Sequence, residues 1–174
     1  ADAVFSAFKI ASTDTTNLPF LKKIAKTNKP IILSTGMSFL HEVKLALEEI
    51  NKYNKDVIIL QCTANYPIKD EEANLNVIRT YQKSFDILVG YSDHSVGLGA
   101  SLYAVPMGAK VIEKHFTISR TMEGPDHAAS LEPSELKQMV ESIRNIELAL
   151  SGNGEKEPSA SELKNKVAAR KSIY

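Results

Sequence analysis

The sequence predicts an α/β fold in which helices cover a parallel β-sheet. Five short, apolar, β-rich runs recur along the 174 residues. Their centres lie roughly 20–30 residues apart, the length of one strand–helix unit. The runs lack the alternation of apolar and polar residues seen in strands with one wet face, so we expect both faces to be covered. With right-handed crossovers, two architectures remain: an open doubly wound sheet or a βα barrel.

The strands and helices follow from local composition. The predicted strands, in chain order, are Ala7–Ala11, Pro30–Leu33, Asp56–Gln61, Ile87–Tyr91 and Lys110–Glu113. Apolar residues at helical spacing predict a helix around residues 43–50. A long helix is predicted from Ser134, just after Pro133, and Gly152 and Gly154 end it. The polar tail contains Gly, Pro and Ser, which predicts a linker with at most one short helix from Ser161.

The number of strands decides between the two architectures. A closed (β/α)8 barrel needs eight strands, and five are predicted. No GxGxxG follows the first predicted strand, so a dinucleotide-binding sheet has little support. The length and the first residue, Ala1, favour a piece of a barrel. We therefore predict an α/β fold with a partial (β/α)8 TIM barrel over residues 1–150 and a linker segment over residues 151–174.

Composition narrows the classes of partner. Acidic and basic residues balance at 21 each, so the formal net charge is zero. A neutral surface indicates neither a nucleic-acid nor a membrane partner and favours a small-molecule ligand. Cys62 is the single cysteine, which excludes an intrachain disulfide. Because no signal peptide and no apolar run near about 18 residues is present, we expect a soluble, cytoplasmic protein.

Two histidines, His94 and His115, lie just after the fourth and fifth predicted strands. In parallel α/β folds the carboxyl edge of the sheet is where chemistry is placed. A single histidine there more often satisfies a buried backbone group, but a pair on consecutive strand ends favours a shared divalent metal. Imidazole binds metals such as zinc, manganese or iron. Two histidines without a third protein ligand would leave positions for substrate and water.

Other polar residues gather at the same predicted edge. Lys9, Ser12 and Ser92 could hold a phosphate or carboxylate, because an ammonium group and hydroxyls donate to anionic oxygens. An exposed strand-end charge is the alternative for Lys9, although its apolar neighbours make burial without a partner costly. Cys62 follows an apolar run with no base nearby in sequence, so we interpret it as a small buried residue.

Three aspartates and two further histidines have several interpretations. Asp14, Asp93 and Asp126 could be acid–base groups, residues that orient a metal ligand, or helix caps. For Asp93, beside a candidate ligand, we favour support of the ligand or of a backbone turn. His41 is predicted to lie at a helix start on the surface, and His127 stays open.

Several strings together resemble one known family. KIAS, KPIILSTGM, GYSDHS, VIEKHFT and GPDH are similar, in order, to motifs of the sialic acid synthase (N-acetylneuraminate synthase) family, which includes legionaminate, pseudaminate and spore-coat polysaccharide synthases. The resemblance runs from about residue 7 to residue 146. It implies a (β/α)8 barrel that condenses phosphoenolpyruvate with N-acetylmannosamine or a related N-acylated aldose. It also implies a divalent metal, manganese or magnesium, a homodimer, and strands four to eight of the barrel. An antifreeze-like domain follows the barrel in the family.

The resemblance assigns roles to individual positions. His94 and His115 match metal-binding histidines. Lys9, Ser12 and Ser92 match phosphoenolpyruvate-binding positions, and Tyr66 and Asp126 match residues that contact the amino sugar. The implied catalytic residues are Lys9, Asp14 and His115. Asp14 stands where the family commonly has glutamate, so this carboxylate is shorter by one methylene.

Two other functions remain open at this point. One is another phosphoenolpyruvate-dependent aldose condensation, of the kind that makes octulosonate or heptulosonate acids. The other is non-catalytic: a barrel fragment with open strand edges that associates with itself.

Overall fold

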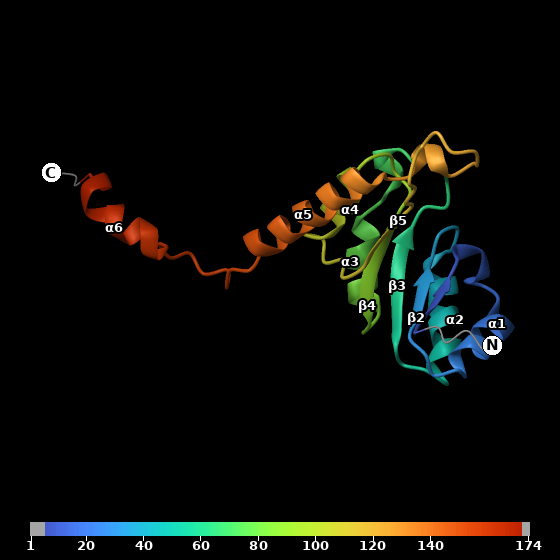
Figure 1. The fold of residues 1–174 in the computed structure, drawn as a ribbon. Coiled ribbons are helices and arrows are strands. Elements are labelled where there is room, and N and C mark those ends of the chain that lie inside the picture. The colour runs from blue at the N-terminus through green and yellow to red at the C-terminus, as the bar shows by residue number, and fades with distance from the viewer. Residues whose placement is uncertain (1–5, 172–174) are drawn as a thin grey trace.

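Five parallel strands form one sheet in the order β1-β2-β3-β4-β5 in the computed structural model, which describes residues 6–171. The strands are β1 (Phe8–Ile10), β2 (Ile31–Ser34), β3 (Val57–Cys62), β4 (Leu88–Asp93) and β5 (Ile112–Lys114). Each strand pairs with its predecessor in the chain, and the sheet curves as a barrel wall does (Figure 1). A doubly wound sheet would reverse its strand order part-way. The order confirms the predicted partial barrel.

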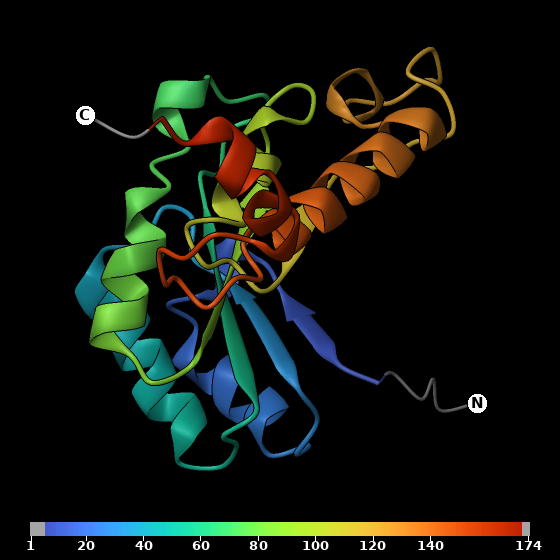
Figure 2. The same cartoon turned by 90° about the vertical axis from the view of Figure 1, so that its left-hand side faces the viewer.

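Helices cover the outer face of this wall. They are α1 (Leu18–Ala25), α2 (Leu40–Asn51), α3 (Asn76–Ser84), α4 (Gly99–Ala104) and α5 (Pro133–Ala149). A further helix, α6 (Ala160–Ala169), follows in the tail, and 3₁₀ turns lie at Ser12–Asp14, Asp70–Glu72 and His127–Ala129. Figure 2 shows α1, α2 and α3 lying against the sheet. Strand residues such as Leu33, Ile59 and Val89 are buried against α-helical residues such as Val43 and Ile78. Burial of these side chains is the main force that holds the layers together.

The inner face of the wall differs from the outer face. Successive strand residues point to opposite faces, so Ile32 and Ile58 alternate with the residues buried under the helices. Both are only partly buried, and Leu88 is 55% exposed. Inner positions of a closed barrel are filled by side chains from all of its strands. This face therefore corresponds to the inside of a barrel, which these five strands enclose only in part.

The predicted strand boundaries hold to within one or two residues, and α2 begins three residues before the predicted helix around residues 43–50. The long helix begins at Pro133, one residue before the prediction, because proline suits the first helical position. The short helix of the tail is α6, which begins at Ala160 beyond a Ser159 cap. The tail is exposed over residues 151–171 wherever its side chains are described, and α6 lies away from the sheet (Figure 1). Within residues 6–171, no helix is both long and apolar enough to cross a bilayer.

Candidate active site

A small polar cavity of about 80 Å³ lies at the carboxyl edge of the strands. Its lining comes from all five strands or the turns after them: Lys9, Ala11, Ser12, Ser34, Cys62, Tyr66, Ser92, His94, Glu113 and His115. Six of the eight residues predicted to form a site are among these. The remaining two, Asp14 and Asp126, are not part of the lining.

The two histidines face each other across β4 and β5. Asp93 pairs with Lys114 in the strand register, which places the next residues, His94 and His115, side by side. Their ring centroids are 5.5 Å apart, and the rings are nearly perpendicular. The pair therefore meets at the edge, as its sequence positions predict.

The ring of His94 is held in one orientation. Its Nδ1 lies 2.7 Å from the carbonyl oxygen of Thr63, and a carbonyl only accepts, so Nδ1 is assigned the proton. Burial lowers the pKa of His94, although the Thr63 hydrogen bond acts in the opposite direction. In the neutral ring Nε2 is then unprotonated. This is the tautomer in which Nε2 can bind a metal.

The donor set is consistent with an open metal site. Within residues 6–171, no group of three or more His, Cys, Asp or Glu side chains is arranged to hold a metal ion. Two imidazoles at this spacing would supply part of a coordination shell, and substrate and water oxygens would supply the rest. Such an arrangement suits Lewis-acid chemistry better than a closed structural site.

A hydrogen-bonded group on the other side of the cavity contains the predicted anion-binding residues. The ammonium of Lys9 donates to the Ser34 hydroxyl at 2.9 Å and lies 3.4 Å from Glu113 Oε1. The Ser92 hydroxyl donates to the same carboxylate oxygen at 2.7 Å. Ser12 Oγ accepts from the Gly36 amide at 2.9 Å. The side chain of Lys9 is 35% exposed, so it has partners and is still accessible to a ligand.

Tyr66 covers one side of the histidine pair. Its ring stacks on His94 with centroids 3.9 Å apart and meets the edge of His115 at 5.0 Å. The residue is 55% exposed. The ring is therefore accessible to solvent beside the two imidazoles.

The two predicted carboxylates lie further out. Asp14 ends the 3₁₀ turn Ser12–Asp14, and its Oδ1 accepts from Asn17 at 3.3 Å. Asp126 is exposed in the loop after β5, directly before the 3₁₀ turn His127–Ala129. His127, left open above, lies 2.7 Å from the Thr117 hydroxyl through Nδ1. The predicted roles of Asp14 and Asp126 stay predictions.

Ser34 and Glu113 line the cavity but were not among the predicted site residues. The period of two along a strand could have identified Glu113, because it precedes His115 by two positions and shares its face. Ser92 precedes His94 in the same way. Cys62 is buried, as expected, and burial raises the pKa of its thiol. It also lies 4.0 Å from His94 Nδ1, which the sequence did not indicate.

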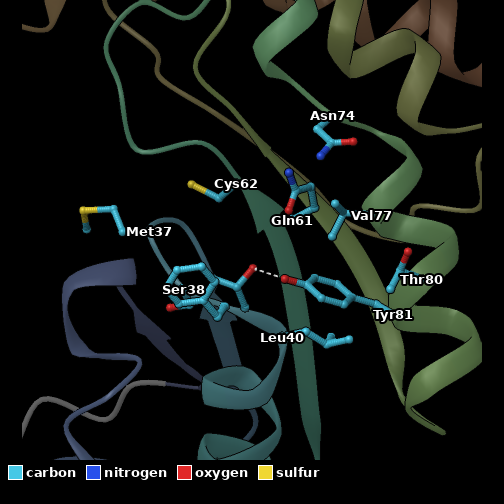
Figure 3. A pocket seen from close by; sticks show the side chains of 11 residues that line it. Met37, Ser38, Leu40, Gln61, Cys62, Asn74, Val77, Thr80 and Tyr81 are labelled. Atoms are coloured by element: carbon cyan, nitrogen blue, oxygen red, sulfur yellow. Dashed lines mark hydrogen bonds between the residues drawn. The ribbon is translucent and has the colours of Figure 1, made fainter.

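A larger cavity of about 350 Å³ lies beside the first, between the β2–α2 turn and α3. Figure 3 shows Tyr81 of α3 pointing towards this turn, where its hydroxyl donates to Thr35 Oγ1 at 2.9 Å. Cys62 lines both cavities. None of the predicted site residues contributes to the larger one, so we place the candidate site in the smaller cavity.

Comparison with known proteins agrees with this geometry. Residues 1–156 match the model of the NeuB family. The chain belongs to the NeuB family. It is 52% identical to an uncharacterized protein of Methanocaldococcus jannaschii over 96% of this chain, and 50% identical to the N,N'-diacetyllegionaminic acid synthase of Campylobacter jejuni over 95%. This NeuB chain spans about half the length of these curated relatives.

A solved structure supports the NeuB fold. The N-acetylneuraminic acid (sialic acid) synthetase of Leptospira borgpetersenii serovar Hardjo-bovis, in complex with citrate, superposes with a TM-score of 0.85 at 37% identity. The match covers 94% of this chain and 57% of the synthetase chain. The expected family and the partial barrel are thus both confirmed, and the named relatives are synthases of sialic-type acids.

Proposed function

We propose that the protein containing this chain condenses phosphoenolpyruvate with an N-acylated aldose, such as N-acetylmannosamine, to a nine-carbon sialic-type 2-keto acid. C3 of phosphoenolpyruvate bonds to the aldehyde carbon, water adds at C2, and phosphate leaves. One observation supports this above all: a cation, hydroxyls and two imidazoles from five successive strands line one cavity. The names of the relatives point to the same class of product.

The two histidines on one side of the cavity and the anion-binding residues on the other would have different functions. A divalent ion, manganese or magnesium, bound by His94 and His115 would polarise the aldehyde oxygen of the open-chain sugar. Lys9 supplies positive charge for the phosphate or carboxylate of phosphoenolpyruvate, and the hydroxyls of Ser12 and Ser92 donate to its oxygens. This contribution is positioning together with electrostatic stabilisation.

Glu113 prepares the anion side for its ligand. Its carboxylate holds both the Lys9 ammonium and the Ser92 hydroxyl. The Lys9 ammonium is thereby oriented before a substrate arrives, and the single hydroxyl hydrogen of Ser92 would turn from Glu113 to a substrate oxygen when phosphoenolpyruvate binds. Donors oriented in advance need little reorganisation during the reaction. Tyr66, stacked over His94, would pack against the sugar's N-acyl group, and the exposed Asp126 would accept from sugar hydroxyls.

A substrate panel tests the proposal. The full-length protein is incubated with phosphoenolpyruvate and one aldose at a time, phosphate release is followed, and the product mass is determined. N-acylated aldoses should release phosphate and give a 2-keto acid, while chelator should abolish release and manganese should restore it. A clear preference for arabinose 5-phosphate or erythrose 4-phosphate would overturn the proposal in favour of an octulosonate or heptulosonate synthase.

The resemblance also makes a homodimer the proposed assembly, and the cytoplasm stays the proposed location. Light scattering of the full-length protein tests the first.

A further inference from the structure

A buried ion pair joins the two strands that end at the candidate metal ligands. Lys114 Nζ lies 3.0 Å from Asp93 Oδ2, and the exposed fractions of the two side chains are 3% and 0%. The two residues are directly paired in the β4–β5 register. Each immediately precedes one histidine of the cavity, so whatever fixes this pair also fixes the distance between the two strand ends.

Asp93 also fixes the backbone that follows His94. Its Oδ1 accepts from the Ser95 amide at 2.8 Å, and its Oδ2 accepts from the amide and hydroxyl of Ser101 in α4 at 3.0 and 2.6 Å. Lys114 donates to the carbonyl of Ser95. Both backbone groups of Ser95 are therefore bound to the ion pair. The His94 carbonyl accepts from the Ile68 amide at 3.0 Å.

The position of the pair excludes direct contact with a ligand in the cavity. Successive strand residues point to opposite faces, and Ser92, His94, Glu113 and His115 line the cavity. Asp93 and Lys114 therefore face the helical layer, where the pair is buried. A buried ion pair often adds little stability compared with apolar side chains of similar volume. We therefore interpret this pair as a device that fixes the positions of the two strand ends.

We infer that Asp93 and Lys114 are positioning residues, which hold His94 and His115 at the separation that a divalent cation requires. This inference rests on the proposed metal site. The pair neutralises itself, so it adds no net charge beside the ion. Residues that orient metal ligands in this way commonly change metal affinity when they are replaced.

The test replaces the pair while keeping side-chain volume, with the variant Asp93→Asn/Lys114→Met in the full-length protein. The control is Lys137→Met/Glu141→Gln, which removes an exposed pair on α5 with a 3.8 Å separation. Mn²⁺ alone is the probe, with free ion measured by electron paramagnetic resonance. The absorption spectrum with Co²⁺ reports ligand geometry, and thermal unfolding without metal reports the fold.

We expect the Asp93/Lys114 variant to bind Mn²⁺ about tenfold or more weakly and to change the Co²⁺ spectrum, while the control matches the wild type. Ser101→Ala, which removes one hydrogen bond to Asp93 and no charge, should weaken Mn²⁺ binding by a smaller factor. If the double variant does not fold, Ser101→Ala decides: unchanged affinity and an unchanged spectrum would overturn the inference.

His94→Ala separates this inference from the proposed function. If His94→Ala binds Mn²⁺ as tightly as the wild type, the proposed metal site is wrong, and this inference falls with it. If His94→Ala loses the ion but a folded Asp93/Lys114 variant keeps full affinity and the wild-type Co²⁺ spectrum, the inference alone is wrong.

Discussion

The candidate site residues differ in whether their polar atoms already have hydrogen-bond partners in the protein. Lys9, Ser92 and His94 all have protein partners, which orients them in advance. Among the residues that the structure describes, none donates a hydrogen bond to the exposed carboxylate of Asp126. Removing that carboxylate should therefore leave the fold intact.

Asp126→Ala should raise the Michaelis constant for the amino sugar about tenfold, since losing a hydrogen bond to a ligand costs on the order of 1–3 kcal/mol. The constant for phosphoenolpyruvate should stay within about twofold, because only sugar binding is weakened. Glu123→Ala, at another exposed acidic position in the same loop, is the control and should change neither constant. If both constants rise together in Asp126→Ala, the residue supports the fold or the metal instead.

Gly90 in β4 occupies a position with no room for a side chain. A Cβ there would lie 2.5 Å from the Val111 carbonyl oxygen and 2.6 Å from a methyl of Leu60. Gly90→Ala should therefore lower the free energy of unfolding by about 2–3 kcal/mol, because overpacking forces the backbone to shift. Gly152→Ala, with no atom near its Cβ, is the control. Equal urea midpoints for the two variants would contradict this account of β4.

The sequence predicts residues at strand ends better than residues in loops. His94, His115, Lys9 and Ser92 meet in the cavity because parallel register carries their positions to one edge. Asp126 lies in a loop whose course no periodicity describes, so the sequence could not place it relative to the cavity. The partners of Glu113 come from β1 and β4, and only the folded sheet brings them together.

The secondary structure elements show why predicted and observed boundaries differ slightly. Four of the five strands were predicted to end one or two residues too early, because pairing extends to Ser34, Cys62, Asp93 and Lys114. Backbone hydrogen bonds do not depend on side-chain polarity, so the ladder continues into the polar edge. These additional strand hydrogen bonds hold the backbone next to the cavity residues in place.

Helix α3 is joined to the end of β2 by one buried hydrogen bond. Tyr81 donates to Thr35 (Figure 3). The Thr35 hydroxyl donates in turn to the Leu60 carbonyl at 2.8 Å. Tyr81→Phe should lower the free energy of unfolding by about 1 kcal/mol, measured by urea denaturation, because a buried acceptor loses its donor. Tyr103→Phe, at a 63% exposed position, should have no measurable effect. A Tyr81 variant as stable as the Tyr103 variant would contradict the predicted role of this bond.

At the scale of the whole molecule, the described residues form an open wall with two edge strands, β1 and β5. The inner face contains the partly buried Ile32 and Ile58 and the exposed Leu88. Unpaired strand edges and an apolar face favour association between copies.

The 174-residue chain, expressed alone, should therefore form dimers or larger species in light scattering. Leu88→Lys should reduce this association, because it places a charge on the inner face while leaving the helical layer unchanged. A monomeric wild-type chain with a sharp unfolding transition would contradict the interpretation of this face as the wall of an incomplete barrel interior.

In the proposed function, His94 and His115 together hold the metal on which the condensation depends. The most direct measurement is the metal content and turnover of His115→Ala in the full-length protein, with phosphoenolpyruvate and N-acetylmannosamine as substrates. Both should fall together, turnover by about two orders of magnitude or more, because the aldehyde is then no longer polarised. Unchanged turnover with unchanged metal content would contradict the claim.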